Sequence, residues 1–200
     1  MHALIVAGGA GSRLGMGEKP LVRICGKPLI SHVTDAFTRS GAEITVITSP
    51  RVPYTANWCR ACGFSLFRGD GKGYVEDILE CAACLELEEP FFTCVADLPG
   101  ISVDFLERVE ETYRTSGRTA CSVWVPSAAF DRAGTRPGYC MEVSGIRASP
   151  SGLNILHGAY LGQDQDEVQV IIDDERLALN INTREDLIAA ERFLCPHGDG

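Results

Sequence analysis

Short apolar runs alternate along this chain with stretches in which apolar residues recur at helical spacing. Residues 3–7 form an uninterrupted apolar run that ends at glycines, which is typical of a strand buried on both faces of a parallel sheet. In residues 28–37 the apolar positions recur every three or four residues, and Gly41 is a natural stop. The N-terminal part therefore predicts a strand, a long glycine-rich loop and a helix.

The same alternation continues through the first half of the chain. Further strands are expected at 44–48, 64–67 and 91–96, and further helices at 54–62, 74–85 and 103–113. Ser102 is the expected N-cap of the last of these helices. Four strand–helix alternations predict an α/β fold, a doubly wound and mostly parallel sheet with helices on both faces and ligands beyond the carboxyl ends of its strands.

The pattern is less regular in the second half. Strands are expected at 120–125, 152–161 and 168–172. The intervening residues 126–150 are rich in Gly, Pro, Ser and Arg, which predicts irregular excursions. Residues 183–186 form a capping box that begins a last helix, and residues 196–200 are expected to fray. Because no repeat or linker interrupts the chain, residues 1–200 are interpreted as a single domain.

Composition and charge narrow the classes of function. At 45 % hydrophobic residues over 200 positions the chain can bury a core. The net charge of −9 argues against a nucleic-acid partner and means that any anionic ligand needs a local positive site. We expect no membrane span, since no apolar run approaches the roughly 18–20 residues required. No basic leader precedes the first strand, so we expect a cytoplasmic protein.

Nine cysteines allow two interpretations. The pairs Cys59/Cys62 and Cys81/Cys84 have a spacing found in four-cysteine zinc sites. The second pair, however, falls within a helical apolar stripe. In a reducing compartment we expect thiols without a disulfide framework, several of them buried, and the zinc alternative stays open.

The glycine-rich segment directly after the first strand is the densest chemical signal. Five glycines in the ten positions 8–17 allow backbone N–H groups to approach phosphate oxygens, and Arg13 and Lys19 add positive charge. The segment lacks the Walker pattern, and Leu14 stands where a dinucleotide fingerprint has its third glycine. Candidate nucleotide-binding residues here are Ala7, Gly8, Gly9, Gly11, Ser12, Arg13 and Lys19.

Other candidates follow later strands. Asp97 comes directly after an apolar strand, where its oxygens suit Mg²⁺, so Arg13, Lys19 and Asp97 are the catalytic candidates. Asp70 could accept from guanine, and Lys72 could serve either the nucleotide or an acceptor phosphate. Further nucleotide-binding candidates are Ser49, Asp70, Gly71, Lys72 and Gly73.

Several of these segments resemble a known family. Residues 4–15, Leu-Ile-Val-Ala-Gly-Gly-x-x-Ser-Arg-Leu-Gly, followed by Lys19-Pro20-Leu21, are similar to the signature of the nucleotidyltransferases that include the molybdenum-cofactor guanylyltransferases and sugar-phosphate nucleotidyltransferases. Asp97-Leu98-Pro99 matches the family's metal-binding strand end, and residues 180–187 match its C-terminal motif. The resemblance implies a Rossmann-like nucleotidyltransferase fold, with Mg²⁺ held by Asp97 and Asn182.

One stretch favours a particular branch of that family. Residues 71–77, Gly-Lys-Gly-Tyr-Val-Glu-Asp, replace the Gly-Pro-Leu-Ala-Gly of the molybdenum enzymes and look like the archaeal adenosylcobinamide-phosphate guanylyltransferases. The resemblance implies transfer of GMP from GTP to adenosylcobinamide phosphate in cobalamin biosynthesis. The candidate acceptor-binding residues are Gly152, Asn154 and Asn180.

Alternatives remain at this point. Within the class, the acceptor could be molybdopterin or a sugar or polyol phosphate. Outside it, the chain could be a nucleotide sensor without activity or a zinc-dependent binding module. The sequence does not distinguish a monomer from a homodimer, and nucleotide preference cannot be read from it.

Overall fold

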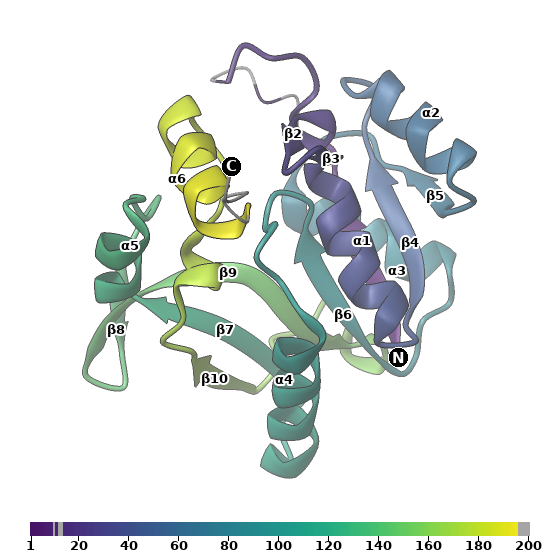
Figure 1. Cartoon of the computed structure of the whole chain (residues 1–200). Helices are drawn as coiled ribbons and strands as arrows, with labels where there is room; N and C mark the ends of the chain where they lie inside the picture. Colours follow the sequence, from purple (N-terminus) through teal and green to yellow (C-terminus); the bar gives the residue numbers. More distant parts are fainter. Residues whose placement is uncertain (10, 12–13, 196–200) are drawn as a thin grey trace.

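Eight strands form one sheet in the computed structural model, which describes residues 1–9, 11 and 14–195 (Figure 1). The order is β5-β4-β1-β6-β9-β7-β10, and β8 pairs with β9 at the margin. The strands are β1 (His2–Val6), β4 (Glu43–Thr48), β5 (Ser65–Arg68), β6 (Pro90–Val95), β7 (Ala120–Pro126), β8 (Met141–Val143), β9 (Ile146–His157) and β10 (Glu167–Ile171). Within this sheet only the described pairings made by β9 are antiparallel, so the sheet is mostly parallel as expected.

Six α-helices lie in the described part of the chain, five of them between strands and the sixth after the last strand. They are α1 (Leu29–Arg39), α2 (Pro53–Ala61), α3 (Tyr74–Cys84), α4 (Val103–Ser116), α5 (Ser127–Ala133) and α6 (Arg184–Leu194). Shorter elements are the 3₁₀ turns η1 (Lys19–Leu21), η2 (Gly158–Tyr160) and η3 (Glu175–Ala178) and the hairpin of β2 (Arg23–Ile24) and β3 (Lys27–Pro28).

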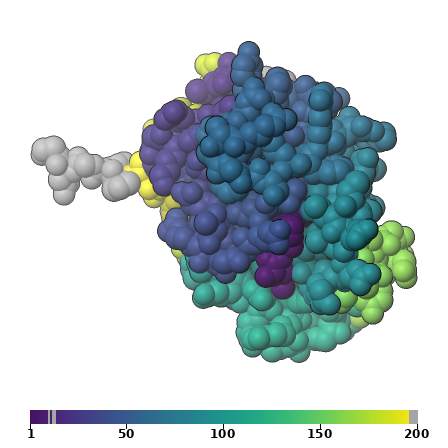
Figure 2. All heavy atoms as spheres, turned by 90° about the vertical axis from the view of Figure 1, so that its right-hand side faces the viewer, coloured from purple at the N-terminus to yellow at the C-terminus, as the bar shows by residue number. Residues whose placement is uncertain are grey.

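Helices cover both faces of the sheet, as the alternating pattern predicts. Side chains of α1 and α4 pack with alternate residues of β1, β6 and β7 in the larger core cluster. Ile78 and Cys81 of α3 pack on the opposite face, against Leu4 and Phe91. Figure 2 shows the purple N-terminal residues at a surface formed mostly by blue and teal segments from the first half of the chain.

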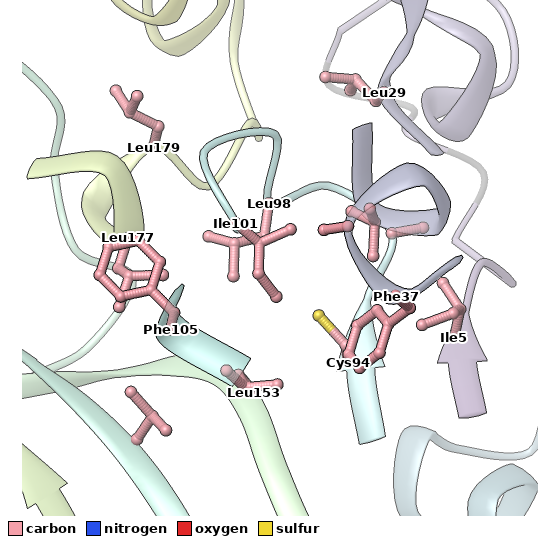
Figure 3. Close-up of a cluster of buried hydrophobic side chains, with 14 of the residues drawn as sticks. Ile5, Leu29, Phe37, Cys94, Leu98, Ile101, Phe105, Leu153, Leu177 and Leu179 are labelled. Carbon is pink, nitrogen blue, oxygen red and sulfur yellow. The ribbon is translucent and has the colours of Figure 1, made fainter. Parts of the chain in front are cut away.

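The segment after β6 is fixed by its apolar side chains. Leu98 is fully buried and Ile101 nearly so. Figure 3 shows both of them between Phe37 and Cys94 on one side and Phe105 on the other. Asp97, directly before Leu98, is therefore held at a defined position at the end of its strand.

Local expectations were met to different degrees. The capping box is confirmed, since Thr183 Oγ1 accepts from Asp186 N at 3.1 Å and Asp186 Oδ2 accepts from Thr183 N at 2.8 Å. Ser102 occupies the N-cap position of α4, but its side chain makes no capping bond.

The expectation of irregular excursions at 126–150 was partly wrong. This segment contains α5, β8 and the beginning of β9, which starts at Ile146 and ends at His157 rather than spanning 152–161. β8 and the early part of β9 pair with each other as a hairpin, which the Gly-, Pro-, Ser- and Arg-rich composition did not indicate. In this part of the chain, as in every other described segment, no helix is long and apolar enough to cross a bilayer.

Seven cysteines are free thiols, so no disulfide framework is present among the described residues, but one disulfide forms that the sequence did not predict. Cys25, in the turn between β2 and β3, forms a disulfide with Cys195, directly after α6. Cys59 and Cys81 pack in core clusters on opposite faces of the sheet, so the two Cys-x-x-Cys pairs do not meet. The described residues contain no group of three or more His, Cys, Asp or Glu side chains that could hold a metal ion.

Candidate active site

A cavity of about 320 Å³ opens at the carboxyl ends of β1 and β6. The chain extends the sheet from β1 through β4 to β5 and then returns to place β6 on the other side of β1. Such a switch point is where open α/β sheets bind their ligands. Eight residues predicted from the sequence line the cavity: Ala7, Gly8, Gly9, Lys19, Ser49, Gly71, Gly73 and Asp97.

Gly8 contacts Ser49, and a close approach to Lys19 explains the glycine at position 11. Ser49 Oγ donates to the carbonyl of Gly8 at 2.8 Å, and a Cβ on Gly8 would lie 3.4 Å from the Cβ of Ser49. Gly11 has a φ of +64°, and a Cβ there would lie 2.4 Å from the Cβ of Lys19. Glycine at position 11 therefore lets the loop fold back onto Lys19. Ser12 and Arg13, two sequence candidates, lie outside the described residues.

Lys19 connects three segments that are distant in the sequence. Its ammonium forms an ion pair with the carboxylate of Asp97 and donates to Asn182 Oδ1 at 2.7 Å. Asn182 Nδ2 in turn donates to Asn180 Oδ1 at 2.8 Å. The structure thus brings together Lys19, Asp97, Asn180 and Asn182, all of which were selected from the sequence.

The carboxylate of Asp97 is only half satisfied. One oxygen pairs with Lys19, whereas Oδ1 is buried and has no hydrogen-bond partner. The backbone carbonyl of Asp97 accepts from Ile181 N at 3.1 Å, which ties the Asn180–Asn182 segment to the end of β6. A buried carboxylate oxygen without a partner is costly unless a ligand or ion completes it, and carboxylate oxygen is the donor that Mg²⁺ prefers.

The loop before α3 places its candidates differently. Gly71 and Gly73 line the cavity, but Asp70 and Lys72 are exposed and pair with each other at 2.6 Å. The hydrogen bond with Lys72 lowers the pKa of Asp70 and raises that of Lys72. Neither side chain lines the cavity in this arrangement.

Sequence reasoning missed Asp77, a buried carboxylate that does line the cavity. Its Oδ1 accepts from Gly71 N at 3.2 Å, and a Cβ on Gly69 would lie 2.7 Å from its Cγ. Asp77 therefore shapes the 69–73 loop. The sequence signal that could have identified Asp77 is its place in the first turn of a helix that directly follows a glycine-rich loop.

Sequence reasoning also missed Glu18. Glu18 Oε2 accepts from Thr55 N and Thr55 Oγ1, each at 2.6 Å, and Oε1 accepts from Tyr54 N at 2.8 Å. Glu18 therefore caps the N-terminus of α2, where the N-cap residue Val52 has no side-chain acceptor. A helix start without Ser, Thr, Asp or Asn was the signal that a distant residue caps it.

The predicted acceptor residues occupy two places. Gly152, with a φ of +86°, packs against Val95, where a Cβ would lie 2.6 Å from Val95 Cγ2. Asn154 Nδ2 donates to Thr93 Oγ1 at 3.3 Å, next to Tyr74. Burial raises the pKa of the Tyr74 hydroxyl to about 12. Asn180 instead lines a separate cavity beside Asn182.

Comparisons with known proteins agree with this geometry. The sequence profile of the MobA-like NTP transferase domain matches residues 3–171. Over 99% of this chain and 100% of the relative, the sequence is 30% identical to the adenosylcobinamide-phosphate guanylyltransferase of Methanocaldococcus jannaschii. Over 58% of this chain and 59% of the relative, it is 26% identical to the molybdenum cofactor guanylyltransferase of Shewanella putrefaciens.

Solved structures show the same fold at low sequence identity. A hypothetical transferase from Thermus thermophilus superposes with a TM-score of 0.71 at 15% identity, over 94% of this chain and 100% of that chain. A CMP:2-keto-3-deoxy-manno-octonic acid synthetase complexed with CTP superposes with a TM-score of 0.69 at 16% identity, over 96% of this chain and 97% of that chain.

Proposed function

Because this chain belongs to the family of MobA-like NTP transferase domains, we propose that it transfers GMP from GTP to adenosylcobinamide phosphate, a reaction that yields adenosylcobinamide-GDP and pyrophosphate. The full-length similarity to a guanylyltransferase for this acceptor supports the proposal, as does the Gly-Lys-Gly-Tyr-Val-Glu-Asp stretch at residues 71–77. The same proposal places the protein in the cytoplasm.

A single observation carries the proposed chemistry. Asp97 pairs with Lys19 through one oxygen and keeps the other buried without a partner, at a cavity that four glycines also line. Nucleotidyl transfer needs a place where a triphosphate is neutralised and aligned, and little covalent work from the protein. A cation, an unsatisfied carboxylate and exposed backbone are the groups suited to that task.

The reaction is a displacement at the α-phosphorus of GTP. An oxygen of the acceptor phosphate forms a bond to that phosphorus, the bond to the β-phosphate oxygen breaks, and pyrophosphate leaves with the electron pair. Lys19 neutralises charge around the α-phosphate in this proposal, and the amides of Gly8 and Gly9 face the triphosphate. We assign Gly11, Ser12 and Arg13 to the same task of binding the triphosphate.

The residues at the end of β6 fit a Mg²⁺ ion. The unpartnered Oδ1 of Asp97 is the donor that we propose for it, and Asn182 is the second candidate. When bound, Mg²⁺ would neutralise phosphate charge and stabilise the leaving pyrophosphate. Asn182 Oδ1 accepts one hydrogen bond from Lys19 in this structure, and its second lone pair is the one that it would offer to the ion.

Two carboxylates are candidates for recognising guanine, which offers the N1–H and the 2-amino group as donors. Asp70 is exposed and paired with Lys72, whereas Asp77 lines the cavity. Their positions favour Asp77 as the guanine acceptor. The pair of Asp70 and Lys72 remains a candidate for closing over the nucleotide.

A pyrophosphate-release assay tests the proposed function. Each of the four nucleoside triphosphates is combined with adenosylcobinamide phosphate, molybdopterin or a sugar phosphate, with Mg²⁺ and without it. We expect release only with GTP, adenosylcobinamide phosphate and Mg²⁺ together. Turnover with molybdopterin or a sugar phosphate instead would assign the chain to another branch of the nucleotidyltransferase family. GTP binding without turnover would indicate a nucleotide sensor.

A further inference from the structure

A second cavity, of about 230 Å³, lies at the same edge of the sheet as the first. Because β9 runs antiparallel, its early residues meet the carboxyl end of β7, where Ser149 pairs with Val125. The polar and charged residues that line this cavity include Arg136, Ser149, Ser151, Asn180 and Asn182. None of its lining residues in the described part of the chain is acidic.

The two cavities share a wall. Asn182 lines the second cavity and accepts a hydrogen bond from Lys19, which lines the first. Asn180 continues this wall through its bond with Asn182, and Ile181 is tied to the backbone of Asp97. Only the side chain of Asn182 therefore separates a group bound in the second cavity from the Lys19–Asp97 pair.

Arg136 brings an uncompensated positive charge to this cavity. Among the described residues no carboxylate lies within 4 Å of it, whereas Arg132 pairs with Asp173 and Glu175, and Arg176 likewise has acidic partners. The backbone beside Arg136 is anchored, because the buried hydroxyl of Thr135 donates to the carbonyl of Ala178 at 2.9 Å. An unpaired guanidinium beside serine hydroxyls and asparagine amides suits a phosphate.

We infer that the second cavity binds the phosphate monoester of the acceptor, with Arg136 as its cation and Asn180 and Asn182 as the groups that hold it against the α-phosphate. This inference rests on the proposed function and adds the place and the residues that select the acceptor. A phosphate monoester is mostly dianionic at neutral pH, since its second pKa is about 6. Its attacking oxygen is already deprotonated, so the absence of acidic residues from the lining agrees with a step that needs no general base.

Steady-state kinetics of Arg136→Ala, Arg136→Lys and the control Arg147→Ala test the inference. Arg147 is exposed, lies nearby on β9 and does not line the cavity. We expect Arg136→Ala to raise the KM for the acceptor by about tenfold or more while the KM for GTP stays within twofold. Arg136→Lys should recover part of the loss, and Arg147→Ala should match wild type. An acceptor KM within twofold of wild type in Arg136→Ala would overturn the inference.

A binding measurement separates this inference from the proposed function. Calorimetric titration with inorganic phosphate is performed in excess GTP, so that the first cavity is filled. Weaker phosphate binding in Arg136→Ala than in Arg147→Ala would support the second cavity as a phosphate site even if no acceptor is turned over. Equal phosphate binding in the two variants would contradict it, whatever the transfer assay gives.

Discussion

Glu18 Oε2 lies 2.6 Å from both the backbone nitrogen and the hydroxyl of Thr55, and so links the glycine-rich loop to the start of α2. The two residues are 37 positions apart. Glu18 directly precedes Lys19, so the bonds that cap α2 also fix the backbone from which the Lys19 ammonium reaches Asp97. Glu18 is therefore a positioning residue for the candidate site.

Replacing Glu18 should weaken both the helix and the site. We expect Glu18→Ala to lower the free energy of unfolding by about 1–2 kcal/mol, as loss of a cap does, and to lower kcat more than it raises the KM for GTP. Glu18→Gln, which keeps one acceptor oxygen, should lie between wild type and Glu18→Ala. Urea unfolding and transfer kinetics measure both effects. The exposed Glu107→Ala on α4 is the control, and a Glu18→Ala protein indistinguishable from it would disprove the positioning role.

Lys19 should matter for charge rather than for shape. Lys19→Met keeps the length of the stem and removes the ammonium, so we expect weaker GTP binding and a transfer rate lower by about a hundredfold or more. Lys27→Met removes an exposed lysine that pairs with Asp35 at 3.1 Å, and should leave the rate unchanged. Equal transfer rates in the two variants would exclude Lys19 from the mechanism.

The Cys25–Cys195 disulfide should stabilise the chain, because it closes a loop with a sequence separation of 170. Crosslinks of long loops typically contribute about 2–4 kcal/mol. We expect Cys195→Ser, or reduction of wild type, to lower the midpoint of urea unfolding, with Cys62→Ser as the matched control on an exposed free thiol. Titration of the oxidised, denatured chain should find the seven free thiols of the structure. Nine titratable thiols would show that the bridge does not form.

Buried thiols predict a loss of stability at alkaline pH. Burial raises the pKa of Cys59, Cys81 and Cys121 from 9.0 to about 12. Between these values the unfolded chain has released thiol protons that the folded chain retains, so the free energy of unfolding falls as pH rises from about 9 toward 12. Urea midpoints across this range measure the slope, which should be smaller in Cys121→Ala and unchanged in Cys62→Ser. Identical slopes in both variants and wild type would refute this account.

The parts of the fold that follow local rules were predictable from the sequence. Apolar runs located β1, β4 and β6, and the strand-end rule placed Ala7 and Asp97 on the cavity. The region 126–150 was harder, because β8 and the early part of β9 are defined by pairing with each other rather than by a periodic pattern.

The remaining features depend on partners that are distant in the chain. No local pattern connects Glu18 to Thr55, Lys19 to Asn182, or Cys25 to Cys195. Asp70, in the glycine-rich loop, was the guanine candidate from the sequence, and Asp77 was not among the candidates. In the structure Asp70 instead pairs with Lys72 in solvent, and the first turns of α3 bring Asp77 to the cavity.

The most direct test of the account is the rate of GMP transfer by Asp97→Asn, measured with GTP labelled at the α-phosphate. Asparagine keeps the shape of the side chain and removes the charge that we propose for Mg²⁺, so the unfolding midpoint should stay close to wild type. We predict that Mg²⁺-dependent transfer to adenosylcobinamide phosphate falls by at least about a hundredfold. A variant that transfers GMP within a few fold of the wild-type rate would contradict the assignment of this cavity as the active site.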